Sequence, residues 1–424
     1  MKKWKRVLAG AMAVMMLIGL SACGEKKTGQ KEEDKQTDVE KTVVTMTYWN
    51  PAETVQPLLD LFEEKLPDIK VEYNYVAHNA YSSTVRTKLL SGNGDDIVAF
   101  DNAEIPPLAK QGILEDMTEL TKDFEFEDGD YVDGKVYMVP MNSWYEGIYY
   151  NKDIFEKNNI EVPTTYSEFL GVCEKLQSLN IKPFTIGAAS YGSLVKCSLG
   201  YVQAEYMFEG EGMNFNEKFM KGEAKMADCL TPYLEQWSEI VKKGYLNSNM
   251  LGITKEQAVD EFAVGMAAMY PSGTWAYESF KQKNANLNFG LMPYMGSKPE
   301  NTCLFGGSGG GYCVNARSKN KEATLRVMEV IASPEGQKAL CQGNPGSFSQ
   351  RKDAEYELPE EYALVKDTIE AGRVLCSWDY WTGSNAETYL GESLQTLLLN
   401  PGLNWKTELE KIDQKIQTFI EKQE

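Results

Sequence analysis

The order of strand and helix patterns after residue 42 is the feature that most restricts the fold. Apolar patterns over 43–49, 69–75 and 96–100 are typical of strands. Apolar residues at helical spacing predict two helices between them, one ending before Pro67 and the other at Gly92. Strands that alternate with helices in this way favour a parallel, doubly wound α/β sheet with helices on both faces.

The remaining length calls for a second body. Roughly 400 residues follow residue 23, more than one ordinary core accommodates, and this predicts two lobes. Thr165 and Glu168 form a capping box before an amphipathic helix, and the final helix places Leu409, Ile412 and Ile416 on one face together with Phe419.

The first 24 residues have the pattern of a secretory signal. Four basic residues within 2–6 precede an uncharged apolar run of 14 residues from Val7 to Leu20, which is too short to span a bilayer. The run ends in Leu20-Ser21-Ala22-Cys23-Gly24, an order that resembles a bacterial lipobox. We therefore expect a signal peptide over 1–22 and lipidation of Cys23, including a palmitate chain. The alternative is a plain secretory signal with Cys23 near the cut by chance.

Residues 24–42 predict a flexible tether between the lipid and a folded body. Eleven of these 19 residues are charged and none is aromatic, so they cannot bury enough surface to offset their ordering entropy. With Cys23, the segment 23–42 would hold the body on the extracellular face of the bacterial cytoplasmic membrane, by its lipid anchor alone.

The charge of the chain restricts its partners. The net charge is −19, and removal of 1–22 leaves 39 basic and 62 acidic residues, a net −23. Such a chain is unsuited to nucleic acid or to an anionic membrane surface. Seven cysteines follow Cys23 without a CxxC pair, His78 is the only histidine, and no zinc pattern is available. We expect no metal and no cofactor, while the sequence leaves a disulfide or a structural calcium open.

Several sequence blocks follow one another in order and together cover nearly all of the mature chain. They are TMTYWNP at 45–51, LLSGNGDDIVAFD at 89–101, LAKQGILEDMTEL at 108–120, the segment 133–169, FAVGMAAMYPSGTW at 262–275, GGSGGGYCVN at 306–315 and ASPEGQKAL at 332–340. This ordered series resembles the extracellular solute-binding proteins of ABC importers, in the sugar-binding branch that includes maltose-binding protein. One difference is Asp95-Asp96, where family members often have Pro-Asp.

The resemblance implies a type II periplasmic-binding-protein-like fold, with two doubly wound lobes joined by a hinge and a ligand cleft between them. The first lobe would contain 43–143 and about 300–332, and the second 144–299 and about 333–424. It also implies a monomer that captures a mono- or oligosaccharide and delivers it to the transmembrane permease. The sequence does not indicate which sugar.

The candidate ligand-binding residues combine strand ends with the resemblance. A sugar site needs aromatic faces for C–H patches, and amides or carboxylates for hydroxyls. Trp275 matches the family's stacking tryptophan, and for each aromatic the alternative is core packing. We expect Asp96 to be structural and the glycines of 306–311 to permit close backbone approach, with a mobile loop as the alternative. The candidates are Trp49, Asn50, Phe100, Asp101, Tyr145, Glu146, Tyr191, Trp275, Tyr312, Trp378 and Trp381.

Hydrolysis and the binding of a different ligand are the alternatives to sugar binding. Residues 306–310 fit the G-x-S-x-G pattern of a hydrolase, but in such enzymes the histidine follows the serine, whereas His78 precedes it. A glycoside hydrolase needs only two carboxylates, and no pair is singled out among 62 acids. We therefore expect a binding protein without catalytic residues. A polyamine or peptide is the alternative ligand, since aromatic-acid clusters also bind amines.

Cys23→Ala tests the anchor. Because the lipid would be attached to this thiol, we expect the variant protein in the medium or as an unprocessed precursor, measured by cell fractionation. Normal processing together with membrane retention would contradict lipidation.

Overall fold

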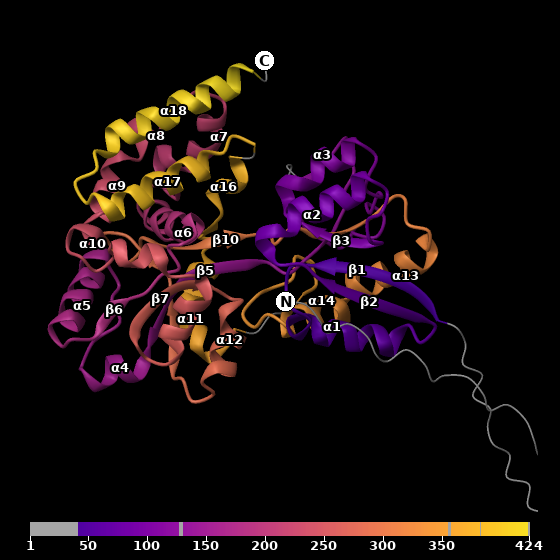
Figure 1. Ribbon diagram of the computed structural model, residues 1–424, viewed down its shortest axis with the longest axis horizontal. Coiled ribbons are helices and arrows are strands. Elements are labelled where there is room, and N and C mark those ends of the chain that lie inside the picture. Colours follow the sequence, from indigo (N-terminus) through magenta and orange to yellow (C-terminus); the bar gives the residue numbers. More distant parts are fainter. Residues whose placement is uncertain (1–40, 127–129, 355–357, 382, 423–424) are drawn as a thin grey trace, which may run out of the picture. The chain divides into compact units, whose positions relative to one another are not determined.

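The computed structural model describes residues 41–126, 130–354, 358–381 and 383–422 (Figure 1). The signal peptide predicted at 1–22, Cys23 and the tether as far as residue 40 lie outside these residues. In the described part of the chain, no helix has both the length and the apolar character that crossing a membrane requires.

The first sheet has five strands in the order β2-β1-β3-β11-β4. Strands β1, β2 and β3 are parallel, and helices α1 and α2 connect them, which confirms the predicted β-α-β-α-β pattern. Strand β11 joins from much later in the chain and runs antiparallel to β3. The bounds are Thr42–Tyr48 for β1, Ala52–Lys65 for α1, Ile69–Tyr75 for β2, His78–Leu90 for α2, Ile97–Phe100 for β3, Val139–Pro140 for β4 and Gly311–Val314 for β11.

Helices cover the first sheet and bury its apolar side chains. Leu58 and Phe62 of α1 share one core with Val44 and Met46 of β1, because helical spacing and strand alternation direct both sets inward. Helices α13 and α14 complete this layer, and both contact α1. Further helices of this half are α3 (Ile105–Lys110), α13 (Lys321–Ala332) and α14 (Pro334–Gln342).

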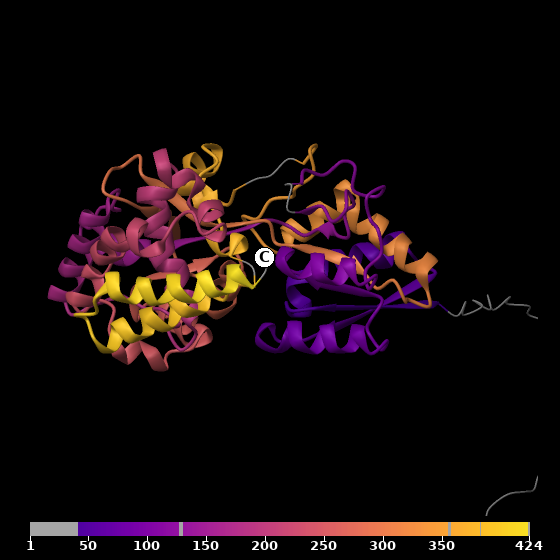
Figure 2. The same cartoon turned by 90° about the horizontal axis from the view of Figure 1, so that it is seen from above.

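The second sheet has seven strands in the described residues, and β5 lies at its centre. The path β12-β10-β5-β7-β6 is joined by β8, which pairs with β5, and β9, which pairs with β10. Figure 2 shows that this sheet and its helices form a half separate from the first sheet. The bounds are Trp144–Asn151 for β5, Lys182–Phe184 for β6, Ala267–Gly273 for β7, Phe289–Met292 for β8, Tyr294–Met295 for β9, Thr302–Gly307 for β10 and Val374–Leu375 for β12.

The second half contains the two helices that the sequence predicts from a capping box and from an apolar face. Helix α5 begins with the predicted capping box of Thr165 and Glu168. Helix α18 buries Leu409, Ile412 and Ile416 as predicted. The helices are α4 (Lys152–Lys157), α5 (Tyr166–Ser178), α6 (Tyr191–Val202), α7 (Phe215–Met220), α8 (Met226–Cys229), α9 (Thr231–Trp237), α10 (Glu239–Lys242), α11 (Lys255–Ala263), α12 (Ala276–Lys283), α15 (Lys366–Glu370), α16 (Ser377–Tyr380), α17 (Ala386–Leu399) and α18 (Trp405–Glu421).

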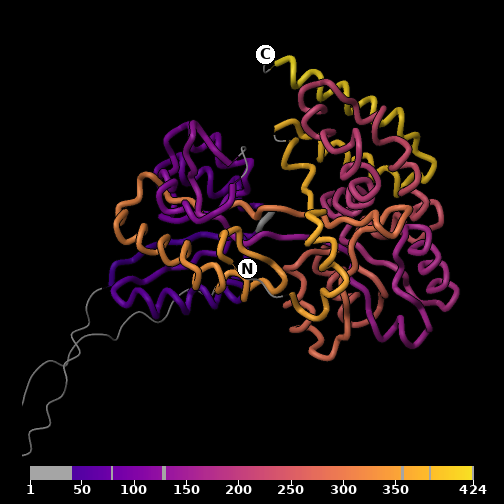
Figure 3. Tube along the Cα trace, turned by 180° about the vertical axis from the view of Figure 1, so that it is seen from behind, coloured from indigo at the N-terminus to yellow at the C-terminus, as the bar shows by residue number. Residues whose placement is uncertain are grey.

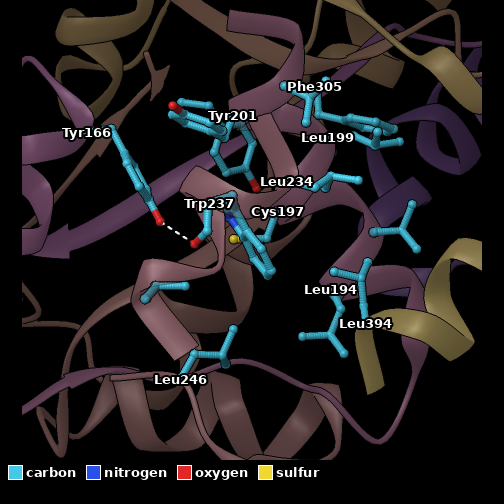
Figure 4. Packing of buried hydrophobic residues seen from close by; sticks show 14 of the residues in the cluster. Tyr166, Leu194, Cys197, Leu199, Tyr201, Leu234, Trp237, Leu246, Phe305 and Leu394 are labelled. Carbon is cyan, nitrogen blue, oxygen red and sulfur yellow. Dashed lines mark hydrogen bonds between the residues drawn. The ribbon is translucent and has the colours of Figure 1, made fainter. Parts of the chain in front are cut away.

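The core of this half forms around α6 (Figure 4). Trp237 is almost fully buried, and its carbonyl oxygen accepts a 2.6 Å hydrogen bond from the hydroxyl of Tyr166. Leu194 and Leu199 of α6 pack in the same cluster. All seven cysteines after Cys23 are free thiols, so the disulfide that the sequence left open is absent from the structure.

Within the described residues the chain passes between the sheets three times, as the tube in Figure 3 follows. The passages lie between β4 and β5, between β10 and β11, and after α14 on the way to a 3₁₀ helix at Glu360–Val365 that packs on β8. The backbone N–H of Met141 donates to the carbonyl of Gly310 at 3.0 Å. The amide of Asn142 donates to the hydroxyl of Ser347 at 2.6 Å, so the three passages are bonded side by side.

Glycines permit this contact, as the sequence predicts. A Cβ on Gly306 would lie 2.2 Å from the carbonyl oxygen of Trp144, and one on Gly310 would lie 2.1 Å from that of Phe100. Gly310 also has a φ of +79°, in the region where side chains are disfavoured. The expected close backbone approach is therefore confirmed.

Asp96 has the structural role that the sequence predicts. One carboxylate oxygen accepts bonds of 2.9 Å from the backbone N–H and the hydroxyl of Thr45 in β1. The other accepts a 2.6 Å bond from the hydroxyl of Ser318, which precedes α13. The side chain thus connects two neighbouring strands to the turn that starts a helix.

Candidate functional site

Trp275 is the most exposed aromatic candidate of the second half, and its ring lies beside that of Trp144. Trp275 lies two residues after the end of β7, at the start of α12, and 39% of the residue's surface is exposed. Its ring centroid lies 5.7 Å from that of Trp144, the first residue of β5, at an interplanar angle of 55°. Gly273 provides the space for this indole, because a Cβ there would lie 2.3 Å from the Trp275 ring.

A buried ion pair lies beside these indoles. Glu146 of β5 bonds Lys196 of α6, and both residues are almost completely buried. The other oxygen of Glu146 accepts a 3.2 Å hydrogen bond from the hydroxyl of Tyr294. The Lys196 ammonium lies 4.6 Å from the ring centroid of Trp275 and 5.8 Å from that of Trp144.

Strand alternation separates Tyr145 from Glu146. Successive residues of a strand point to opposite faces, so Trp144 and Glu146 share one face of β5 while Tyr145 points to the other. Tyr145 is fully buried there, stacked on Phe348. The candidates predicted from the sequence include the neighbours Tyr145 and Glu146, but neither Trp144 nor Lys196. The alternation of β5 and the single charge in the apolar run of α6 were the signals for these two residues.

The aromatic residues after β12 divide in the same way. Trp378 is half-buried, with its ring 5.0 Å from Phe305 in an edge-on arrangement. Phe305 lies 6.1 Å from Trp144, so Trp378 continues the same aromatic row. Trp381 is fully buried and donates from its indole nitrogen to the side chain of Asn216 at 3.1 Å.

Tyr191 lies at the start of α6 and packs against α17. Its hydroxyl lies 3.0 Å from that of Thr388, and its ring fills the space beside Gly391. These contacts direct its ring towards α17.

In the first half, the candidates follow the strands β1 and β3. Trp49 is half-buried, with its ring edge-on to Tyr81 at 5.0 Å. Asn50 donates to the hydroxyl of Tyr48 at 3.3 Å. Both residues come directly after β1, at the carboxyl end of a parallel strand, where ligands bind in sheets of this kind.

Phe100 and Tyr312 are fully buried on neighbouring strands of the first sheet. Tyr312 packs edge-on to Tyr48, with ring centroids 5.5 Å apart. A ligand would therefore reach Phe100 or Tyr312 only after the surrounding side chains moved.

Asp101, directly after β3, is the candidate with the most unusual electrostatics. Its side chain reaches solvent, but protein atoms surround it closely, and its pKa is raised from 3.8 to about 7. Desolvation is the largest cause, followed by the negative charges of Glu104 and Asp379. Glu104 is three residues away, whereas Asp379 belongs to the second half. Carboxylates from both halves thus act on each other, and sequence reasoning did not select Glu104.

The backbone of β10 connects Asp379 to the tryptophans. Gly307 of β10 pairs with Trp144 of β5. A Cβ on Gly307 would lie 4.0 Å from a carboxylate oxygen of Asp379 and 3.7 Å from the side chain of Cys376. Asp379 is therefore close to the end of β10 that pairs with Trp144, and its negative charge also acts on Asp101 of the first half.

The remaining motifs show no metal or nucleophile geometry in the described residues. No group of three His, Cys, Asp or Glu side chains is arranged to hold a metal ion there. The hydroxyl of Ser308, in the G-x-S-x-G pattern, accepts hydrogen bonds from Gln350 at 2.8 Å and from the backbone of Gly310 at 3.3 Å. Ser308 thus connects two of the passages between the sheets.

Comparisons with known proteins agree with this fold. The chain is 26% identical over 368 residues to the multiple sugar-binding protein of Streptococcus mutans, a match that covers 81% of this chain and 84% of that protein. It is 25% identical over 405 residues to the maltodextrin-binding protein MdxE of Bacillus subtilis, covering 91% of each.

A sugar transporter structure from Bacillus licheniformis, solved in complex with stachyose, has the same fold. Its TM-score is 0.68 at 20% identity, with 88% of this chain and 99% of that chain covered. The family model described as bacterial extracellular solute-binding protein matches residues 48–338, well over half of the sequence. The chain belongs to the family of bacterial extracellular solute-binding proteins.

Proposed function

We propose that the protein is the sugar-capturing subunit of an ABC importer and has no catalytic activity. The observation that carries this proposal is the exposed indole of Trp275 beside Trp144 in one half, together with the carboxylate of Asp101 in the other, on which the charge of Asp379 acts. An aromatic face packs on the C–H surface of a sugar, and carboxylates accept its hydroxyls. The names of the relatives, which refer to multiple sugars and to maltodextrin, support a sugar ligand.

The mechanism that we propose is closure of two lobes on one ligand. The lobes correspond to the halves around the two sheets, and the bonded passages between them serve as the hinge. Asp101 contributes from one lobe, and Trp275 and Trp378 from the other. A ligand that contacts both lobes binds the closed state better than the open one, and this difference in affinity is what shifts the equilibrium.

The cellular context follows from the same proposal. Lipidation at Cys23 would hold the protein on the extracellular face of the membrane, while the segment 24–42 lets the lobes diffuse near the permease. The transmembrane subunits would recognise the closed form of a monomeric protein. These parts rest on the sequence pattern of the first 42 residues and on the importer family.

A panel of ligands tests the proposed function. Because a sugar would bind only the folded chain, a concentration of one hundred times Kd should stabilise it by about 2.7 kcal/mol. The measurement is the shift of the melting temperature with stachyose, raffinose and maltotriose. Each sugar is also incubated with the protein and assayed for hydrolysis products, of which we expect none. A shift with spermidine or a peptide and none with any sugar would favour the alternative ligands, which Asp101, Glu104 and Asp379 also suit through their negative charge.

Trp275→Ala is the variant that tests the site within this panel. Loss of a stacking aromatic should weaken sugar binding by roughly 1–3 kcal/mol. The melting temperature without ligand should change little, since an exposed ring leaves little cavity. Tyr131→Ala, which removes an aromatic ring exposed to 45%, serves as the control. Unchanged affinity together with a loss of roughly 3–5 kcal/mol of stability, the cost of a core aromatic, would refute the assignment.

Asp101→Asn tests the carboxylate through pH. Sugar hydroxyls donate to the ionised carboxylate, so binding should lower its pKa and tighten as pH rises through about 7, with release of a proton. The pKa in the folded protein lies above the unfolded value of 3.8, so the folded state binds the proton more tightly. The free energy of unfolding of the empty protein should therefore decrease as the pH rises from about 4 to about 7. Asp101→Asn should remove both dependences.

Calorimetry in buffers of different ionisation enthalpy measures the released proton, and melting curves across this pH range measure the stability. If affinity in the wild-type protein does not depend on pH between 6 and 8, Asp101 does not accept ligand hydroxyls as an ionised group.

A further inference from the structure

Lys196 and Glu146 form an ion pair at a costly position. Lys196 lies in the apolar helix α6 and is 6% exposed, and Glu146 is 1% exposed. Burying two charged groups costs desolvation free energy that an ion pair on the surface does not. The attraction between the charges offsets this cost only when further contacts satisfy both groups. Glu146 obtains such a contact from the hydroxyl of Tyr294.

The contacts of Lys196 are the two indoles. Its ammonium lies 4.6 Å from the Trp275 centroid and 5.8 Å from that of Trp144, within the range of cation–π attraction. This attraction is strongest where water is excluded, as it is around the buried ammonium. Glu146 fixes the position of the ammonium, and the absence of a side chain at Gly273 lets the Trp275 ring approach.

We propose that Lys196, held by Glu146, is a positioning residue that orients Trp275 and Trp144 as a preformed surface for the sugar. The inference rests on the proposed function, because Trp275 must contact the ligand for its orientation to matter. An exposed indole that is already held in one orientation loses less side-chain entropy when a ligand binds. Lys196 therefore acts on affinity through Trp275, without a contact to the sugar.

The test uses variants that avoid an unpaired buried charge. Lys196→Met alone would leave Glu146 uncompensated, so the change is the double variant Glu146→Gln/Lys196→Met, which is neutral and similar in volume. Lys255→Met is the control. The ammonium of Lys255, the first residue of α11, interacts electrostatically with Lys196 and Glu146, so this variant removes a nearby positive charge and keeps the ion pair itself. The control separates a general effect of charge from the effect on the indoles.

The affinity of the purified mature chain for stachyose and maltotriose is measured by calorimetry in a cycle with Trp275→Ala. We expect the neutral pair variant to bind about tenfold more weakly, an effect between those of exposed and of desolvated cation–π contacts. In the Trp275→Ala background we expect a smaller loss, because only the contact of Lys196 with Trp144 remains, and Lys255→Met should bind as the wild type does.

A second measurement needs no ligand. In protein labelled with 5-fluorotryptophan, the Trp275 fluorine resonance is assigned by its loss in Trp275→Phe. It should shift and broaden in the neutral pair variant, because the ring is no longer held in one orientation.

The outcomes separate this inference from the proposed function. If Trp275→Ala weakens binding while the neutral pair variant keeps full affinity and an unchanged resonance, the role of Lys196 is refuted and the sugar site stands. Equal losses with and without Trp275 would also refute it, because Lys196 would then act independently of the indole. If no sugar binds the wild-type protein, the proposed function fails and this inference fails with it.

Discussion

Close backbone contact between the passages that connect the two sheets is the constraint on which the rest of the structure depends. Met141 donates to Gly310, and Asn142 donates to Ser347, so segments more than 160 residues apart are bonded side by side. A side chain at Gly306 would collide with the carbonyl oxygen of Trp144 in β5, and one at Gly310 with that of Phe100 in β3. Because β4, β5, β10 and β11 continue directly from these segments, the contact between the passages sets how the two sheets are joined.

The two halves contribute different chemistry at this place. The second half has an exposed indole, and a buried ammonium lies beneath it, whereas the first has a carboxylate whose pKa is raised by desolvation and by Glu104 and Asp379. Repulsion between Asp101 and Asp379 opposes their approach when both are charged. Under the proposed function, hydroxyl donors from a bound sugar would offset this repulsion, so ligand binding and the approach of the two halves would depend on each other.

The sequence predicted the elements well wherever a local pattern was sufficient. The capping box of Thr165, the inward face of α18 and the glycine contacts all follow from local rules of side-chain geometry. The site was less accessible to such reasoning. Tyr145 and Glu146 were adjacent candidates, yet strand alternation directs them to opposite faces, and Lys196 was absent because its partner lies 50 residues away. The contact of each candidate with a ligand stays a prediction.

By itself, the sequence determined the doubly wound start, the two-body organisation and the family, because periodicity and ordered blocks are properties of neighbouring residues. Only the tertiary structure decided that Trp144 joins Trp275, that Trp381 is buried, and that Asp379 acts on Asp101. These are relations between distant segments. Burial, desolvation and like-charge repulsion depend on which atoms surround a group in space, and this surrounding is settled only when the two sheets and their connecting passages pack together.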